Sequence, residues 1–464
     1  MNLSKDKIVL VVGLGSSGLS TINWLARNNY PYIGWDDSSI VRKDFTQQNY
    51  NIAPTIDTIN WSDISVVILS PGVPYRFPKK SEIILNAERY TIPVKGDISL
   101  LFFALTKRRA EITYVAITGT NGKSTTTSLV GQVLKDAQVN YLLAGNIGIP
   151  VLDLVDDFTG DIIVLELSSY QLDLNIDDYF DIAALLNITP DHLDRHGGLN
   201  GYIEVKGKIF ANQTRNSLAV IATDDQYTQK LALAINPQQL ITASGTGSVH
   251  ADYTVINGML SLNADNGTRE LLYDLNQSKY LHGDHNHQNA AVAYIICKNL
   301  NIRDHQIFES FANYSGLEHR QELVLKSGNM TFINDSKATN ADACAPALKS
   351  FDNIVWILGG VEKAGGIESL VKYMDRVKLA LCYGQSASVF SNSIKQSSTI
   401  ETKVLKSLEE AVDYAIVFCQ SNKILNFTIL LSPSAASFDQ FKNFEHRGTV
   451  FKNYIHKLKK KGRV

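Results

Sequence analysis

The segment that constrains the fold most strongly is a short apolar run followed by glycines, a lysine and hydroxyl residues, at positions 114–126. Residues 115–117 favour a β-strand, and the sequence that follows is Thr-Gly-Thr-Asn-Gly-Lys-Ser-Thr-Thr. From Thr125 onward, apolar residues recur three or four positions apart, which is the period of a helix. In a strand–glycine loop–helix segment, backbone N–H groups and the helix N-terminus face an anion. The pattern therefore predicts an ATP or GTP site.

This loop is tighter than the commonest phosphate-binding loop. The common pattern has a glycine five residues before Gly122, where this chain has Ile117, and the nearer glycine is Gly119. We expect Lys123 to reach the terminal phosphates and the Ser124 hydroxyl to ligate Mg²⁺. A simple Gly/Asn turn is the alternative, and the complete strand–loop–helix context disfavours it.

Composition and charge exclude several classes of protein. The chain of 464 residues has 44 basic and 46 acidic side chains, so no electrostatic footprint for nucleic acid stands out. Its four cysteines are far apart and form no CxxC pair, which argues against a zinc knuckle or a disulfide framework. The first apolar run, 8–12, is too short for a signal peptide, and no run approaches the ~18 apolar residues of a membrane span. We therefore expect a soluble, cytoplasmic protein without membrane insertion.

The first hundred residues alternate expected strands and helices. A strand at 8–12 leads into Gly13-Leu14-Gly15-Ser16-Ser17-Gly18, and acidic residues follow the next strand at Asp36-Asp37. This glycine spacing, with an acid about 20 residues later, is the dinucleotide-binding fingerprint. It predicts a diphosphate seat at a helix N-terminus, suited to NAD or to a nucleotide-diphosphate sugar. The segment Ser70-Pro71-Gly72 would lie at the carboxyl edge of the same sheet, where ligands bind.

Three strands expected in the central part of the chain end at polar residues. They lead to Asn146, to Glu166 and to a segment that contains His192. Because parallel strands with helical crossovers place their carboxyl ends at one edge, we expect these residues near Lys123. Glu166 is in the position of an acid that faces a metal ion at the edge of the sheet, because a carboxylate that pointed into the core without a partner would be costly. A surface glutamate at a strand end is the alternative.

Two groups of histidines look like metal sites, but we do not interpret them so. His192 has a second histidine four residues later, yet no third soft ligand is evident, and Mg²⁺ chemistry fits the neighbouring acids better. His282, His285 and His287 precede a helix expected at 289–300, where polar residues serve as caps and loop.

Beyond about residue 317, strands and helices alternate again, and polar clusters follow the strand ends. No internal repeat of fixed period is present. The sequence thus predicts an α/β fold of three domains. They are a Rossmann-like domain at 1–100, a central P-loop ATPase-like domain with a parallel or mixed sheet at 101–316, and a second Rossmann-like domain at 317–464.

Motifs spread over essentially the whole chain together resemble the Mur ligases. These are Thr118-Gly119-Thr120-Asn121-Gly122-Lys123-Ser124-Thr125, Glu166-Leu167-Ser168-Ser169, Asp191-His192-Leu193-Asp194-Arg195, His319-Arg320 and Asn334-Asp335-Ser336-Lys337-Ala338-Thr339-Asn340. The resemblance implies an ATP-dependent, amide-forming ligase of peptidoglycan precursor synthesis.

Further motifs bear on the substrates within that family. Gly13-Leu14-Gly15 and Ser70-Pro71-Gly72 in front, and the segment 431–448 behind, imply that D-glutamate is added to UDP-N-acetylmuramoyl-L-alanine through an acyl phosphate. L-Alanine-adding relatives usually carry His in place of Asn121, and the Asp-Asn-Pro-Arg signature of diamino-acid-adding relatives is absent from the sequence. The alternatives are a related ligase with another amino-acid or folate-type acceptor, an NAD-dependent oxidoreductase, or a non-catalytic nucleotide-binding protein.

The resemblance also implies roles for individual residues. The catalytic set is Lys123, Glu166, His192 and Lys206. Two Mg²⁺ ions would be held by Ser124, Glu166, His192 and a carbamylated Lys206, with Lys208 as the alternative lysine. ATP would contact Gly119, Thr120, Asn121, Gly122, Lys123, Ser124, Thr125, Asn289, His319, Arg320 and Asp335. The UDP-sugar would contact Gly15, Ser16, Ser17, Asp36, Ser70, Gly72, Asn146 and His192, and D-glutamate would contact Lys337, Thr339, Lys363, Ser437 and Phe444.

The sequence departs from the family pattern at two places. The family often shows Asp-Thr-Arg where this chain has Asp36-Asp37-Ser38, so an arginine contact to the uridine is missing or is supplied elsewhere. The residues before Lys363 also differ from the usual ones, although the lysine keeps its spacing. We expect a monomer with small-molecule substrates and no nucleic-acid partner.

Overall fold

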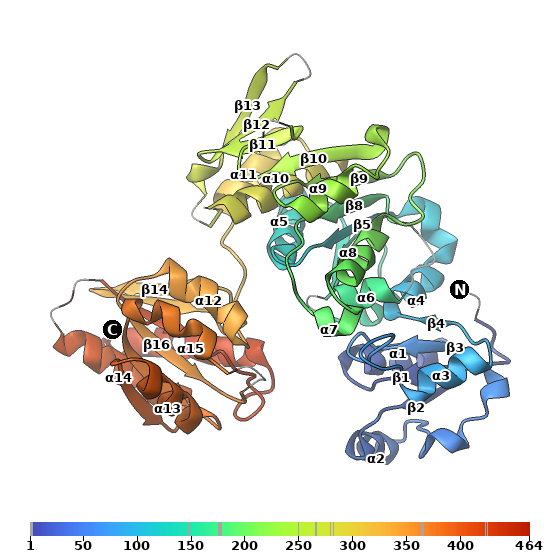
Figure 1. Ribbon diagram of the computed structural model, residues 1–464, viewed down its shortest axis with the longest axis horizontal. Helices are drawn as coiled ribbons and strands as arrows, with labels where there is room; N and C mark the ends of the chain where they lie inside the picture. The colour runs from blue at the N-terminus through green and yellow to red at the C-terminus, as the bar shows by residue number, and fades with distance from the viewer. Residues whose placement is uncertain are drawn as a thin grey trace. The chain divides into compact units, whose positions relative to one another are not determined.

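A computed structural model gives the fold of the chain. It describes residues 3–146, 149–174, 179–248, 250–264, 267–278, 280–281, 283–362, 366–422, 424 and 426–464, without the side chains of residues 110 and 342. The chain forms two compact units, Met1–Ser315 and Gly316–Val464 (Figure 1). The first unit holds a four-stranded and a nine-stranded sheet, and the second holds a six-stranded sheet. The expected α/β fold class is confirmed, whereas the division of the first unit near residue 100 stays a prediction.

The four-stranded sheet is parallel and has the order β2-β1-β3-β4. From β1 the chain continues to β2 on one side, and from β3 it continues to β4 on the other side, so the strand order reverses between β1 and β3. In open α/β folds, ligands bind at such a switch point. The strands are β1 (Ile8–Val12), β2 (Tyr32–Trp35), β3 (Ile64–Leu69) and β4 (Val94–Lys95), and the helices are α1 (Ser16–Arg27), α2 (Ser39–Gln47) and α3 (Glu82–Arg89).

The nine-stranded sheet is mixed, with the order β13-β12-β11-β10-β9-β8-β5-β7-β6. Its strands are β5 (Thr113–Thr118), β6 (Tyr141–Gly145), β7 (Ile162–Glu166), β8 (Ile182–Leu185), β9 (Leu218–Ala222), β10 (Leu240–Ser244), β11 (Tyr253–Ile256), β12 (Met259–Asn263) and β13 (Arg269–Asp274). The part from β6 to β11 is parallel, and β12 and β13 add an antiparallel edge. The helices are α4 (Asp97–Ala104), α5 (Lys123–Asp136), α6 (Ser169–Asp173), α7 (Leu193–His196), α8 (Leu199–Gly207), α9 (Gln226–Ala232), α10 (Asp284–Asn299) and α11 (Asp304–Asn313).

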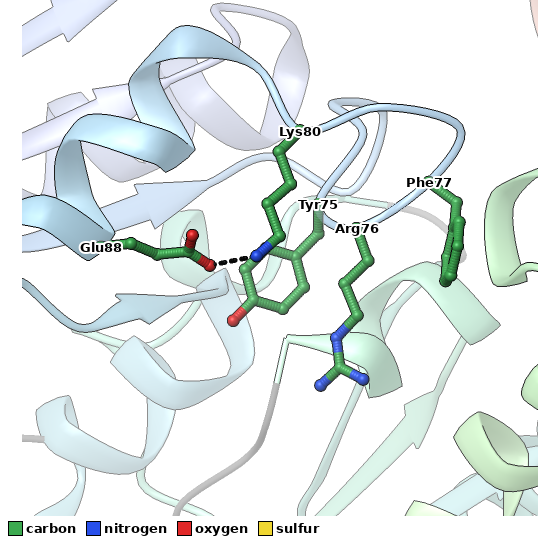
Figure 2. A pocket seen from close by; sticks show the side chains of 5 residues that line it. All are labelled: Tyr75, Arg76, Phe77, Lys80 and Glu88. Atoms are coloured by element: carbon green, nitrogen blue, oxygen red, sulfur yellow. Dashed lines mark hydrogen bonds and ion pairs between the residues drawn. The ribbon is translucent and has the colours of Figure 1, made fainter.

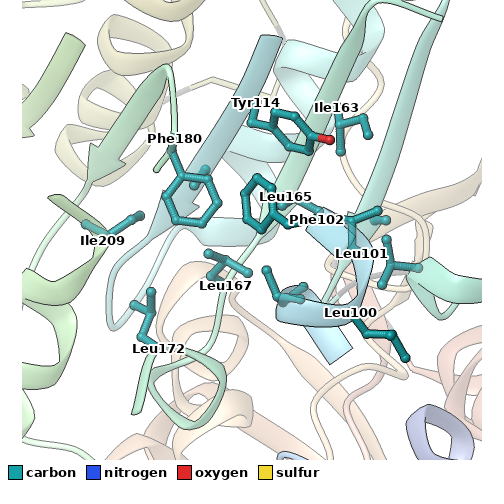
Figure 3. Packing of buried hydrophobic residues seen from close by; sticks show 14 of the residues in the cluster. Leu100, Leu101, Phe102, Tyr114, Ile163, Leu165, Leu167, Leu172, Phe180 and Ile209 are labelled. Atoms are coloured by element: carbon teal, nitrogen blue, oxygen red, sulfur yellow. The ribbon is translucent and has the colours of Figure 1, made fainter. Parts of the chain in front are cut away.

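Helices pack on both faces of the nine-stranded sheet because its central strands are apolar on both sides. In β5, Val115 and Ile117 face one core, whereas Tyr114 and Ala116 face the other. Figure 3 shows the second of these cores, where the Phe102 ring of α4 lies 4.6 Å from the Tyr114 ring. The same core continues into the apolar residues of β1. The two sheets therefore share one core, which fixes the turn after β1 relative to the loop after β5.

Helix α10 corrects one expectation. It begins at Asp284 and not near residue 289, so His285 and His287 lie in its first turns and not in an entry loop. Gly283 (φ 83°) is the N-cap of the helix. The carboxylate of Asp284, at the first helical position, stabilises the positive end of the helix dipole. The first turns carry polar residues, so the apolar period begins later than the helix does. His282 lies outside the described residues.

The second unit has the sheet order β14-β15-β19-β16-β17-β18, parallel except for the β14–β15 hairpin. Its strands are β14 (Glu322–Ser327), β15 (Met330–Asn334), β16 (Ile354–Gly359), β17 (Val377–Tyr383), β18 (Glu401–Leu405) and β19 (Phe427–Leu431). Helices α12 (Ala341–Ser350) and α13 (Ala387–Ser397) cover one face, and α14 (Leu408–Ser421) and α15 (Phe444–Lys460) cover the other.

Short 3-10 helices complete the secondary structure. They are η1 (Ile56–Thr58), η2 (Trp61–Asp63), η3 (Thr106–Glu111), η4 (Val151–Asp153), η5 (Lys208–Phe210), η6 (Pro237–Gln239), η7 (Leu275–Gln277) and η8 (Glu368–Arg376). None of the helices in the described ranges is both long and apolar enough to cross a bilayer.

Candidate functional site

The loop between β5 and α5 has the geometry of an anion seat. Gly122 adopts a left-handed conformation (φ 83°) at the N-cap of α5, and within the described residues no side chain caps this helix end. A Cβ at Gly122 would lie 2.2 Å from Asn289 Oδ1, so only glycine fits there. The sequence thus brings Asn289, far along the chain, to the loop. The nucleotide-facing role expected for Asn289 stays a prediction.

Two lysines converge on the same loop. The Nζ of Lys123 donates to the carbonyls of Gly119 (2.9 Å) and Thr120 (2.8 Å). The Nζ of Lys206 donates to the Gly119 carbonyl (2.8 Å) and to Thr118 Oγ1 (3.3 Å). Lys206 is 1% exposed, and its burial, reinforced by the charge of Lys123, holds the pKa of its amine well below the usual range. A neutral amine is the form that can react with CO₂.

The alternative lysine lies elsewhere. The Nζ of Lys208, at the start of η5, pairs with the carboxylate of Asp173 at 3.3 Å. Lys206 is the candidate whose amine bonds to the phosphate loop.

Glu166 has an oxygen directed into the protein without a hydrogen-bond partner. Its side chain is 1% exposed, and Oε1 accepts from Asn146 Nδ2 at 3.1 Å, whereas Oε2 has no partner among the described residues. In the parallel register, Glu166 lies opposite Ile117, directly before the phosphate loop. A buried carboxylate oxygen of this kind fits a hard cation such as Mg²⁺, and Ser124, buried at the start of α5, offers a hydroxyl of the same chemistry. Within the described residues, no three His, Cys, Asp or Glu side chains gather as a metal-binding group.

His192 lies at the entry to α7 in a left-handed conformation (φ 50°), which is strained for a residue with a Cβ. Its ring is exposed, lies 3.4 Å from the Asp191 carboxylate and packs 5.0 Å from the ring of Tyr170. His196 is instead buried, with Nε2 at 3.0 Å from Ser169 Oγ, and burial lowers its pKa. Both rings pack against the Tyr170 ring, His196 at 5.8 Å, but one is exposed and the other buried.

Two residues that the sequence analysis missed hold the phosphate loop. Asn187, directly after β8, exchanges hydrogen bonds with the backbone N–H (2.8 Å) and carbonyl (3.1 Å) of Asn121. The Tyr202 hydroxyl lies 3.1 Å from Thr120 Oγ1. A signal existed for Tyr202, because it precedes Lys206 by four residues and so shares its face of α8.

The turn after β1 has the form of a diphosphate seat. Gly13 has φ 86°, and a Cβ at Gly18 would lie 1.9 Å from the Gly13 carbonyl oxygen, so the turn requires glycine at both positions. Gly15 caps α1 without a side-chain bond, and N–H groups at an uncapped helix N-terminus are suited to bind an anion. Asp36 and Ser70 support this turn: Asp36 Oδ2 accepts from Leu14 N (2.9 Å), and Ser70 Oγ donates to the Gly13 carbonyl (2.6 Å).

Arg42 was also missed. Its guanidinium lies 4.3 Å from the Trp35 ring and donates to the carbonyls of Asp36 and Asp37, at the carboxyl end of β2. The family pattern places its arginine close to this point. A search for arginines one helical turn into α2 would have found Arg42.

In the second unit, polar residues follow β15. Asp335 is buried, accepts from Ser432 Oγ (2.7 Å) and Gln321 N (3.1 Å), and has its pKa raised to about 7 by burial. His319 is buried as well, with Nδ1 at 2.9 Å from Asn334 Nδ2, whereas Arg320 is exposed. Of the residues expected to face ATP from this unit, Arg320 is therefore the one with an accessible side chain.

Part of the set expected to bind D-glutamate is brought together. The Lys337 ammonium lies 5.9 Å from the ring of Phe444, and the Thr339 N–H donates to the Lys337 carbonyl (2.9 Å). Ser437 is buried in the loop before α15. Lys363 lies outside the described residues.

A buried arginine ties the strand ends of this unit together. The guanidinium of Arg447 is fully buried and donates to Ser336 Oγ (2.9 Å) and to the carbonyls of Ser336 (2.9 Å), Ala435 (3.1 Å) and Gly359 (3.3 Å). The sequence analysis gave this residue no role. A weak signal was its position four residues before the buried Phe451, on the apolar face of α15.

Two hollows lie beside the loop that follows β3. The larger, of about 560 Å³, is lined by Tyr75, Arg76, Phe77, Lys80 and Glu88, with Lys80 paired to Glu88 as Figure 2 shows. The smaller, of about 340 Å³, shares Arg76 and Phe77 and extends to His196. Neither hollow is lined by residues of the phosphate loop. The contacts of the loops, and not the hollows, therefore define the candidate site.

Comparison with known proteins shows the family to which the chain is similar. Residues 117–297 match the Mur ligase middle domain, and residues 319–434 match the Mur ligase, glutamate ligase domain. The UDP-N-acetylmuramoylalanine–D-glutamate ligase of Rickettsia prowazekii (strain Madrid E) is 37% identical over 455 residues, which cover 97% of this chain and 98% of that protein. The protein of the same name from Caulobacter sp. (strain K31) is 39% identical over 469 residues, with 98% and 97% covered.

Solved structures share the fold at lower identity. UDP-N-acetylmuramate-alanine ligase MurC from Thermotoga maritima superposes with a TM-score of 0.56 at 18% identity, covering 97% of this chain and 99% of that one. MurF from Acinetobacter baumannii superposes with a TM-score of 0.55 at 18% sequence identity, and the match covers 85% of this chain and 86% of that one. From the full-length similarity to its curated relatives and the two matched domains, the chain belongs to the Mur ligase family.

Proposed function

We propose that this chain is an ATP-dependent ligase that adds D-glutamate to UDP-N-acetylmuramoyl-L-alanine through an acyl phosphate, in the synthesis of peptidoglycan precursors. The observation that carries the proposal is the convergence of Lys123 and Lys206 on the Gly119 carbonyl, with Glu166 paired to Ile117 on the strand that leads into the same loop. The names and full-length similarity of the curated relatives support the choice of substrates.

The main physical problem of this reaction is the negative charge of a triphosphate next to a reacting carboxylate. In the proposal, the N–H groups at the start of α5 and the Lys123 ammonium bind the phosphates. Ser124, Glu166, His192 and Lys206 would hold two Mg²⁺ ions, which would supply Lewis-acid stabilisation of the transferring phosphoryl group. The carboxylate oxygen of the acceptor attacks the terminal phosphorus, and ADP leaves. The neutral amine of D-glutamate then attacks the acyl carbon, loses a proton and expels phosphate.

Lys206 would contribute as its carbamate. The lone pair of the neutral amine forms a bond to the carbon of CO₂, one C=O bond pair moves to oxygen, and the nitrogen releases a proton. The product is an anionic oxygen ligand in place of a cation. The lowered pKa of Lys206 supports this reaction, because a protonated amine has no lone pair to offer.

The acceptor would bind to the first unit. Gly15, Ser16 and Ser17 would hold the diphosphate, with Gly72, Asn146 and His192 along the sugar, while Asp36 and Ser70 keep the turn in shape. Arg42 is our candidate for the arginine that the family pattern places near the uridine.

The incoming amino acid would bind to the second unit. The ammonium groups of Lys337 and Lys363 suit the two carboxylates of D-glutamate, with Thr339, Ser437 and Phe444 completing the pocket. Asn289, His319, Arg320 and Asp335 would serve the nucleotide.

We also propose three domains, at 1–100, 101–316 and 317–464, and a monomer that works in the cytoplasm. The demand for ATP supports this compartment, and the four cysteines are all buried thiols without disulfides.

The test is phosphate release from ATP and Mg²⁺ with UDP-N-acetylmuramoyl-L-alanine, comparing D-glutamate with L-glutamate, meso-diaminopimelate and L-lysine. Release that requires both the UDP-sugar and D-glutamate is the expected result. Release with a diamino acid would keep the chemistry and overturn the pocket. No release with any of them would overturn the proposed function.

A further inference from the structure

The side chain of Arg195 connects three segments that carry the candidate site. Its guanidinium donates from Nη1 to the Gly72 carbonyl (3.2 Å), and from Nη2 to the carbonyls of Val73 (3.2 Å) and Pro71 (3.5 Å). These three carbonyls belong to the loop after β3, which flanks the diphosphate seat of the first sheet.

The other contacts of Arg195 lead to the nine-stranded sheet. The guanidinium lies 4.4 Å from the centre of the Tyr170 ring, four residues after Glu166. The same ring packs 5.0 Å from His192, whose carbonyl accepts from the Arg195 N–H at 3.0 Å. Arg195 itself lies in the segment after β8, and its side chain contacts the loop of the four-stranded sheet and, through Tyr170, the segment after β7.

Neighbouring contacts show that the loop is docked along this whole segment. Arg76 lies 3.7 Å from the buried carboxylate of Asp173, and a Cβ at Gly197 would lie 2.7 Å from the Phe77 ring. In this arrangement the three carbonyl oxygens of residues 71–73 all accept from the planar guanidinium of Arg195. Three carbonyls in a fan match the several fixed N–H groups of a guanidinium and do not match an ammonium, which acts as a point donor.

His192 needs such support, since its left-handed backbone (φ 50°) is strained and its ring is exposed. A strained conformation persists only where surrounding contacts hold it. We propose that Arg195 is a positioning residue: it holds His192 in its working geometry and couples that geometry to occupancy of the diphosphate seat by the UDP-sugar. Only the kinetic test of this inference rests on the proposed function.

The first experiment is steady-state kinetics of Arg195→Lys in the full-length enzyme, with Arg27→Lys as the matched control. Arg27 also spans the two sheets of this unit, through the Leu152 carbonyl (3.1 Å) and Asp156 (3.0 Å), but contacts none of the three site segments. We expect Arg195→Lys to lower kcat by about 10- to 100-fold, because small displacements of catalytic groups cost rates of this order. KM for the UDP-sugar should rise and KM for ATP should stay unchanged. Arg27→Lys should keep kcat within about twofold.

A double-mutant cycle separates positioning from general support. If Arg195 acts through His192, Arg195→Lys adds little further loss of activity in a His192→Asn background. Losses that multiply independently would overturn the inference, as would a kcat of Arg195→Lys within about twofold of the wild type.

Hydrogen exchange gives a readout that does not depend on activity. UDP-N-acetylmuramoyl-L-alanine alone should slow amide exchange at residues 191–198 of the wild type, and Arg195→Lys should lose that response at an unchanged melting temperature. Without ligand, Arg195→Lys should already exchange faster at 70–74 and 191–198, and Arg27→Lys should not. Unchanged exchange in Arg195→Lys would refute the inference even if the wild type proved to be a different ligase. Absent ligase activity together with the expected exchange pattern would refute only the proposed function.

Discussion

Replacing Glu166 by Gln should make the ligand-free protein more stable while removing its activity. Glu166 is 1% exposed, one carboxylate oxygen has a single donor in Asn146, and the other has no partner among the described residues. A buried polar group without a hydrogen bond costs about 1–3 kcal/mol, and more when it is charged. Glutamine keeps the shape and the bond from Asn146 but carries no charge. We therefore expect a gain of about 1–2 kcal/mol in the free energy of unfolding.

The assay is thermal unfolding with and without ligand. One kcal/mol corresponds to about 2–4 °C for proteins of 150–250 residues, and to less in a longer chain. Without ligand, Glu166→Gln should melt higher than the wild type. With MgATP the order should reverse, because a ligand at 100 times its Kd adds about 2.7 kcal/mol to a protein that binds it, and the variant would lack the proposed metal ligand.

The matched control is Glu309→Gln, which removes an exposed carboxylate from α11. Surface substitutions of this kind change stability by about 0.5 kcal/mol or less, so this variant should melt with the wild type in both conditions. An unliganded Glu166→Gln that melts at or below the wild type would refute the reasoning, since burial of the carboxylate charge would then carry no cost.

Three other predictions follow from the lysines and the buried acid. Lys206→Ala should lose activity that added formate or acetate partly restores, and Lys208→Ala should keep most of it; full activity in Lys206→Ala would remove this lysine from the metal site. Asp335 has a folded pKa of about 7, raised above its ordinary value, so the folded protein takes up a proton between about pH 4 and 7. The stability that the protonated Asp335 carboxyl contributes is thus complete at low pH and is lost as pH rises through 7, by up to about 4 kcal/mol. The free energy of unfolding of Asp335→Asn should lack this pH-dependent loss, and an identical pH dependence in both proteins would contradict the prediction. Lys337→Met should raise KM for D-glutamate about 10- to 100-fold at unchanged KM for ATP, because a charge-assisted hydrogen bond contributes about 1.5–3 kcal/mol; equal KM values for D-glutamate would exclude it from the pocket.

The sequence predicted well those features that depend on local backbone preferences. The strand before Thr118, the glycine loop and the helix after it all follow from residues adjacent in the chain. The meeting of Glu166 with the phosphate loop was also predictable, because parallel strands align their carboxyl ends at one edge. The start of α10 was not, since its first turns carry polar residues and show no apolar period.

The partner of a polar side chain was much less predictable. Asp36 matched the position of a ligand-binding acid, yet in the fold it accepts from the Leu14 N–H and supports the turn. Arg195 lay in a motif that implied a ligand site, and the fold directs its guanidinium to carbonyls more than 120 residues earlier in the chain. Such contacts depend on how two sheets pack, and no local pattern records that packing.

The sequence by itself determined the α/β class, the phosphate-binding loop, the diphosphate turn and the family. These rest on strand and helix periodicity and on glycines whose backbone angles few other residues adopt. Only the tertiary structure showed that Lys206 bonds to the Gly119 carbonyl whereas Lys208 pairs with Asp173, although both lie on one short segment. It also buried Arg447 against carbonyls from three strand ends and left one oxygen of Glu166 without a partner in the part of the chain that the structure describes. The physical reason is that burial and hydrogen-bond partners arise from long-range packing, which sets the charge and reactivity of a side chain after its backbone is already fixed.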